Sequence, residues 1–210
     1  MLVKHEYVTK DKVVVVKETD SKEAALKRLT DSGYRCIPVL DEAGEKYVGN
    51  IYKVDLLREE IDDELDGTIA RLIRDQEDGH IKEEAPFFNV FSTIKRLPFL
   101  AVVEDDQEFL GILTNANVIS VLEQAWGAER GSYSYTIGTI EYAGALQQML
   151  EIINEYCTVE SVISLNNDLK FVRRVCIVLP KDVTEKTADQ ISEDLEANNF
   201  TVIHRETLNK

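Results

Sequence analysis

Two short runs, each beginning with a glycine, carry the side chains best suited to holding a ligand. They read Gly111-Ile-Leu-Thr-Asn-Ala-Asn117 and Gly49-Asn-Ile-Tyr-Lys-Val-Asp55. A hydroxyl three residues after the glycine, as at Thr114, falls near the start of a helix, where free N–H groups and the helix dipole favour an anion such as phosphate. An amide or carboxylate three residues further on can accept hydrogen bonds from a ribose diol. The runs contain no nucleophile paired with a base, so they indicate binding and not catalysis.

Both runs lie at corresponding places in an internal repeat. The first unit predicts a strand over 13–16, a helix over 21–32, strands over 36–40 and 47–51, and a helix over 53–60. The second predicts a helix over 88–96, strands over 100–103 and 109–113, and a helix over 117–125. Gly49 and Gly111 are 62 residues apart, and Val39 and Val102 are 63 apart. We therefore expect two copies of one unit, at about 1–66 and 67–126, to form a pair.

At these residues the chain resembles the CBS domain, whose repeats pair into a Bateman module and whose signature is a glycine followed by Ser or Thr and Asp at this spacing. The stretch Gly33-Tyr-Arg-Cys-Ile-Pro-Val-Leu-Asp41 is similar to the family's other signature, a glycine and an arginine ahead of a Pro-Val strand. The resemblance implies that the paired repeats bind an adenine nucleotide.

The resemblance also assigns roles to individual residues, which we take as expectations. Arg35 and Thr114 would contact phosphate, the backbone near Ile37 would contact the adenine edge, and Asp55 or Asn117 would hold the ribose. The rings of Tyr34 and Phe99 could stack on a purine or could belong to the core. Arg35 could instead be a surface arginine, and Thr114 and Asp55 could simply cap helices.

Three positions depart from the family pattern. Tyr52 stands where the first repeat would have a small hydroxyl residue, Asn117 stands where the second would have Asp, and Pro98 stands where the second would have its arginine. Neither repeat is complete by itself. We expect one competent pocket assembled from both repeats or across a dimer, or else a ligand other than simple AMP.

A second domain is predicted beyond a break at residues 125–132, where Gly127 and Gly131 flank charged residues. We expect a linker at 127–132 and a domain at 133–210 with the order β-α-β-β-α-β of a ferredoxin-like fold. This segment is similar to the ACT domain, which implies a possible amino-acid effector site at Gly144. The run Glu141-Tyr-Ala-Gly-Ala-Leu146 lacks the acidic residue usual before that glycine. The fold class predicted for the whole chain is α/β (α+β).

Composition limits the classes of function. The 39 acidic residues outnumber the 24 basic ones and give a formal charge of −15, which disfavours nucleic acid as a partner. His5, His80 and His204 have no partner at metal-ligand spacing, so no metal site is expected. No P-loop, dinucleotide or hydrolase motif is present, and we expect no enzyme. Three cysteines without a C-x-x-C pair and the lack of a long apolar run predict a cytoplasmic protein without a membrane segment.

A CBS pair followed by an ACT domain resembles the AcuB-type proteins and the cyclic-di-AMP-binding CbpA proteins of Firmicutes. This resemblance implies a non-catalytic regulatory sensor whose ligand is cyclic di-AMP or AMP, ADP or ATP, with no other cofactor. The sensor would signal to an unidentified protein partner and form a homodimer. The alternative is an adaptor that works without nucleotide, through its ACT or CBS surface.

Overall fold

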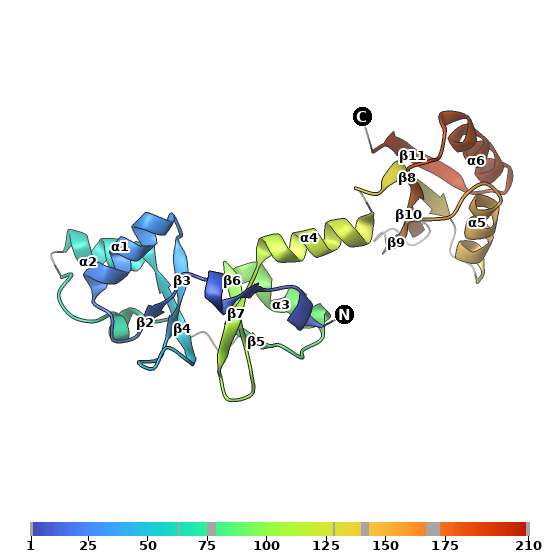
Figure 1. Cartoon of the computed structure of the whole chain (residues 1–210). Coiled ribbons are helices and arrows are strands. Elements are labelled where there is room, and N and C mark those ends of the chain that lie inside the picture. Colours follow the sequence, from blue (N-terminus) through green and yellow to red (C-terminus); the bar gives the residue numbers. More distant parts are fainter. Residues whose placement is uncertain are drawn as a thin grey trace. The chain divides into compact units, whose positions relative to one another are not determined.

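The computed structural model describes residues 2–62, 64–74, 79–127, 129–139, 143–166 and 173–208. The chain separates into two compact units, Met1–Ile119 and Ser120–Lys210, and each is considered by itself (Figure 1). Both units combine helices with strands, so the predicted α/β class is confirmed. Among the described residues no helix has the length and apolar character needed to cross a membrane.

The first repeat is a three-stranded sheet covered by two helices. Its elements are β2 (Val16–Lys17), α1 (Lys22–Ser32), β3 (Cys36–Leu40), β4 (Tyr47–Tyr52) and α2 (Lys53–Ile61), with strand order β2-β3-β4. Helix α1 begins after Ser21, whose hydroxyl oxygen accepts a hydrogen bond from the Ala24 N–H at 3.1 Å. Leu26 and Leu29 of α1 are buried with Ile37 and Ile51 of the sheet in one apolar core.

The second repeat places its hairpin in a four-stranded sheet. Its elements are β5 (His80–Lys82), α3 (Val90–Thr93), β6 (Phe99–Val103), β7 (Phe109–Thr114) and α4 (Asn115–Trp126). The N-terminal strand β1 (Val8–Thr9) pairs with β7, which gives the strand order β1-β7-β6-β5. Short 3₁₀ helices lie at Val3–His5, Lys10–Lys12, Ile69–Leu72, Phe87–Asn89 and Ile94–Arg96.

The two repeats are joined by side chains and by backbone. Leu40 and Tyr47 of the first repeat pack against Ala101, Val103 and Phe109 of the second in a shared core. The two hairpins also exchange hydrogen bonds, because the Tyr47 N–H donates to the Gln107 carbonyl at 3.0 Å and the Phe109 N–H donates to the Glu45 carbonyl at 2.8 Å. The repeats therefore form one packed pair.

Two of the predicted elements are wrong in detail. The strand expected at 13–16 is reduced to Val16–Lys17, because Val13–Val15 insert their side chains into the two neighbouring cores instead of pairing along a sheet. The helix expected at 88–96 is one α-helical turn between two 3₁₀ turns. Val90, Thr93 and Ile94 are β-branched and lose side-chain freedom in a helix, which is consistent with this irregular course.

The second unit has the predicted ferredoxin-like order. Its elements are β8 (Gly131–Thr139), α5 (Ala145–Asn154), β9 (Ser161–Asn166), β10 (Arg173–Pro180), α6 (Glu185–Ala197) and β11 (Thr201–Thr207). The strands form an antiparallel sheet of order β11-β8-β10-β9, and α5 and α6 cover one face of it (Figure 1). Met149, Ile153, Ile191 and Leu195 of the helices are fully buried against this face.

Candidate functional site

A cavity of about 390 Å³ lies between the two repeats of the first unit. Repeat 1 contributes residues 33–38, which lead from α1 into β3, and repeat 2 contributes the start of β6 and the end of β7. The N-terminal segment, from Val8 to Val14, forms a further wall. This volume is within the range of small-molecule sites in proteins.

The lining of this cavity is apolar with a few cationic and hydroxyl groups. Its apolar surface includes Pro38, Pro98, Phe99 and Ile112, together with the valines of the N-terminal segment. Its side-chain polar groups are those of Lys12, Tyr34, Arg35 and Thr114, with the thiol of Cys36. No carboxylate occurs among the described residues that line it, although the chain as a whole carries a formal charge of −15. The arrangement suits a flat apolar group that carries an anion.

Gly111 allows the N-terminal wall to form. Strand β1 pairs with β7 so that Val8 lies opposite Ile112 and Thr9 lies opposite Gly111. A Cβ atom at position 111 would come within 2.0 Å of the Val8 carbonyl oxygen and 2.8 Å of the Tyr7 ring. The first glycine of the predicted binding run is therefore required for close approach of two backbone segments.

Thr114 and Asn117 bond to each other at the start of α4. The Thr114 hydroxyl and its backbone N–H both donate to Asn117 Oδ1, at 2.5 and 3.1 Å, and the Asn117 N–H donates to the Thr114 hydroxyl oxygen at 3.2 Å. Thr114 lines the cavity, whereas Asn117 is not among its lining residues and holds the Thr114 side chain through these bonds. Asn117, predicted as a ribose ligand, is hydrogen-bonded to Thr114 in this structure, and its role toward a ribose stays a prediction.

Tyr34 and Arg35 reach the cavity because α1 ends sharply. Gly33 adopts the left-handed conformation, with φ of 73°, and closes the helix as a C-cap. The Tyr34 ring is 54% exposed, so it is not a core residue. The Arg35 side chain is exposed and forms no ion pair with a described residue. Ile37 also lines the cavity.

Cys36 contributes a neutral group to the lining. Burial raises the pKa of its thiol to about 12, so the sulfur stays protonated at neutral pH. A thiolate that would repel an anionic ligand is thereby avoided. Lys12 was not expected from the sequence, and the only local signal for it is the basic run Lys10-Asp-Lys12 just before the valines.

Asp55 does not line this cavity. Both of its carboxylate oxygens accept hydrogen bonds from Arg74, from Nε at 2.9 Å and from Nη2 at 2.7 Å. The Asp55 side chain is 11% exposed, and the guanidinium of Arg58 lies 3.7 Å away. The hydrogen bonding of Arg74 to the Asp55 carboxylate is the largest cause of a raised pKa at Arg74. Asp55, which the sequence had grouped with Arg35 and Thr114, is therefore paired with Arg74 and is not among the residues that line this cavity, although its charge acts on the neighbouring thiol of Cys36.

Asn50, in the first binding run, is an unusual buried polar residue. It is fully buried, and neither its side-chain oxygen nor its side-chain nitrogen has a hydrogen-bond partner among the described residues. Its backbone pairs with Arg74 in both directions, at 3.1 and 2.9 Å. A buried amide without partners is costly, and such groups usually bind ordered water.

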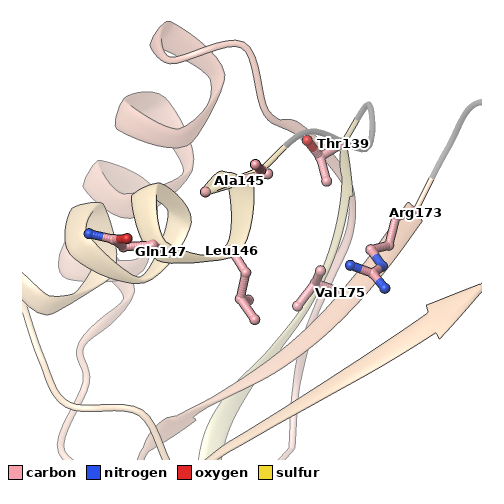
Figure 2. Close-up of a pocket in the computed structure, with 8 residues that line it drawn as sticks. Thr139, Ala145, Leu146, Gln147, Arg173 and Val175 are labelled. Carbon is pink, nitrogen blue, oxygen red and sulfur yellow. The ribbon is translucent and has the colours of Figure 1, made fainter.

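A second cavity, of about 490 Å³, lies in the second unit where β8 ends and α5 begins. Gly144 lines it with a φ of 93° and precedes the first turn of α5. Figure 2 shows Leu146 pointing toward Val175, Arg173 on the same strand as Val175, and Gln147 directed away from Arg173. Residues 141 and 142 of the predicted effector motif lie outside the described residues.

One group of carboxylates in the described part of the chain comes close enough to share a cation. The ligand atoms of Glu104, Asp106 and Glu108 lie within 4.8 Å of one another in the turn between β6 and β7. All three side chains are exposed, and exposed acidic groups commonly gather without binding an ion.

The chain is similar to a known domain family and to several solved structures. Residues 3–62 match the CBS domain family. The chain is similar to a CBS domain-containing protein of unknown function from Bacillus anthracis, with 28% identity and a TM-score of 0.54 over 59% of this chain and 93% of that one. It is similar in fold to CbpB in complex with c-di-AMP, with 21% identity and a TM-score of 0.53 over 59% of this chain and 85% of that one.

A third similar structure is a CBS domain pair/ACT domain protein from Thermotoga maritima, with 22% identity and a TM-score of 0.52 over 60% of this chain and 98% of that one. None of the curated protein sequences matches the chain. The matched segment, residues 3–62, contains Arg35, Cys36 and the first binding run. Residues 3–62 are thus similar to a CBS domain, and the solved structures share its fold over about 59% of the chain.

Proposed function

We propose that the chain is a non-catalytic regulatory sensor that binds an adenine nucleotide in the cavity between its two repeats. The observation that carries this proposal is the cavity lining, which combines apolar walls with Lys12, Arg35 and Thr114 and contains no described carboxylate. The base would lie between the apolar walls, with the exposed ring of Tyr34 free to stack on it. The phosphate would meet Arg35 and Lys12 through charge-assisted hydrogen bonds.

Cyclic di-AMP is the leading ligand, with AMP, ADP and ATP as alternatives. The resemblance to CbpA and AcuB-type proteins supports this choice, and the similarity in fold to CbpB bound to c-di-AMP is consistent with it. The binding signal would pass to a protein partner, and we expect the sensor to act as a homodimer. The three cysteines are free, which fits a reducing cytoplasm.

The domain at about 133–210 is proposed to modulate the sensor as an ACT-like domain, with an effector site at Gly144. The cavity beside the start of α5 supports this assignment, because it is lined by Gly144, Thr139 and Arg173. An amino-acid carboxylate would lie near the helix start and Arg173. The linker was expected at 127–132, but β8 already begins at Gly131, so the proposed linker is limited to residues 127–130.

The alternative function is an adaptor that needs no nucleotide. The internal pairing of Asp55 with Arg74 favours it, because this pair removes one expected ligand residue from use. The apolar side chains of Val54, Leu57 and Ile61 on α2 are exposed and offer a surface for a partner.

Titration calorimetry with each of the four nucleotides distinguishes these functions. We expect binding of at least one nucleotide, and we expect Arg35→Ala to weaken it by about 1.5–3 kcal/mol while Arg71→Ala leaves it unchanged. Arg71 is an exposed arginine remote in sequence from the cavity segments, so it controls for the loss of one positive charge. The absence of binding at about 100 µM for all four nucleotides would reject the sensor and leave the adaptor.

A further inference from the structure

The two repeats offer the same backbone positions for a ligand but fill them differently. With the offset of 62 residues, Asn50 corresponds to Ile112, Tyr52 to Thr114, and Asp55 to Asn117. The edge pairing also corresponds, since Val8 pairs with Ile112 in the second repeat and Arg74 pairs with Asn50 in the first. The first repeat can therefore be compared with the second, residue by residue.

In the second repeat, the last residue of β7 is Thr114, a small polar residue. Thr114 lines the cavity, and its hydroxyl donates to Asn117 Oδ1 and accepts from the Asn117 N–H. In the first repeat a tyrosine takes the place of Thr114, and no side-chain hydrogen bond from Tyr52 caps α2. The guanidinium carbon of Arg74 lies 4.8 Å from the centre of the Tyr52 ring. A flat cation is thus stacked on a flat ring at this point.

The same arginine also uses the acceptors of the first repeat. Arg74 donates two hydrogen bonds to Asp55, one to each carboxylate oxygen, at 2.9 and 2.7 Å. The backbone of Arg74 is also fixed in place, because it exchanges two hydrogen bonds with the backbone of Asn50. Position 49 must be glycine for this approach, because a Cβ there would lie 2.9 Å from the Arg74 carbonyl oxygen and 2.7 Å from Ile73. The chain is therefore shaped to bring Arg74 to Asp55.

We propose that the side chains of Arg74 and Tyr52 act as an internal occupant of the first repeat: they fill the place where a second nucleotide would otherwise bind. The guanidinium takes the acceptors of Asp55 that a ribose diol would use, and the Tyr52 ring takes space that the second repeat leaves beside Thr114. These two residues set the stoichiometry of the sensor at one nucleotide per chain. This inference rests on the proposed nucleotide function. It adds that the site of the first repeat is closed, and that Arg74 and Tyr52 close it.

The test combines stoichiometry with three variants of the full chain, titrated with AMP and with cyclic di-AMP. Each wild-type chain should bind one ligand, in the cavity between its two repeats, so the molar ratio should be one AMP per chain. Asp55→Asn should change the affinity by less than twofold, because its carboxylate is already used by Arg74. The double variant Tyr52→Ser with Arg74→Ala should raise the ratio to two, and Arg71→Ala should leave it at one.

The outcomes separate this inference from the proposed function. Two AMP molecules per wild-type chain, or a loss of affinity above tenfold in Asp55→Asn, would overturn the internal occupant while leaving the sensor in place. A ratio that stays at one in a folded double variant would also overturn it. If the wild type binds no nucleotide, the proposed function fails, and the inference stands only if the double variant gains one site.

A measurement without ligand covers the case in which the double variant does not fold. The side-chain Nε–H of Arg74 can be followed by NMR in the wild type and in Asp55→Asn. The bidentate pair predicts a distinct, slowly exchanging Nε–H signal that Asp55→Asn removes. A signal that exchanges as fast as that of exposed Arg71 would overturn the pairing on which the inference depends.

Discussion

Replacing Gly111 by alanine should detach the N-terminal wall of the cavity. The added Cβ would lie 2.0 Å from the Val8 carbonyl oxygen, so β1 must move by more than about 1 Å to reach ordinary contact. That movement breaks the short ladder between β1 and β7, where each hydrogen bond contributes about 1 kcal/mol net. With the displaced Tyr7 ring added, we expect a loss of about 2–4 kcal/mol of unfolding free energy.

Two readouts check this prediction on the full chain. Urea denaturation reports the loss of stability, and hydrogen–deuterium exchange reports whether the amides of residues 8–14 become unprotected. Gly67→Ala is the control without a close contact, because no atom lies within 4 Å of the added Cβ. Unlike Gly111, Gly67 has a positive φ, 92°, that disfavours alanine, so the control carries a backbone penalty that Gly111→Ala does not. We expect the control to lose only about 1 kcal/mol. An alanine at 111 that leaves stability within about 0.5 kcal/mol and exchange unchanged would refute the close-approach argument.

Three further predictions concern single side chains. Arg35→Ala should weaken nucleotide binding by about 1.5–3 kcal/mol in calorimetry, the contribution of a charge-assisted hydrogen bond, and an unchanged affinity would remove Arg35 from the site. Asn50→Val should raise the unfolding free energy by about 1 kcal/mol, because it removes an unpartnered buried amide, whereas a marked loss in urea denaturation would show that water or a ligand satisfies it. Tyr7→Phe should flatten the decline of stability at high pH. Burial, together with a hydrogen bond to Glu83, raises the pKa of Tyr7 to about 12 in the folded protein. The stabilisation that protonated Tyr7 contributes is therefore complete below pH 10 and is lost between pH 10 and 12. Equal slopes for the two proteins in urea titrations over that range would contradict it.

The sequence predicted most of the elements because they follow clear periodicities. The helix at 21–32 and the strands at 36–40 and 47–51 appear almost where they were expected, as does the ferredoxin-like order of the second unit. Strands β1 and β5 were missed, since two or three residues are too few to show alternation. Their pairing depends on partners about 100 and 21 residues away in the chain, respectively, such as Val8 with Ile112 and Ile81 with Val102.

The candidate site was predicted in part for a similar reason. Arg35, Tyr34 and Thr114 come together because they lie at the ends of elements that the repeat pattern already placed. Asp55 was grouped with them because its spacing from Gly49 matches that of Asn117 from Gly111. Its actual partner, Arg74, lies 19 residues downstream and reaches it through a backbone bridge that no local pattern encodes.

The most direct test of the central claim is to locate the bound nucleotide by NMR. Backbone amides of the isotope-labelled chain would be followed during titration with cyclic di-AMP and AMP. Binding in the cavity predicts saturable shifts at residues 8–14, 33–37, 99, 112 and 114, with smaller changes at Arg74 and Gly144. Shifts that saturate elsewhere and spare Arg35 and Thr114, or no shifts with either nucleotide, would contradict a nucleotide site between the repeats.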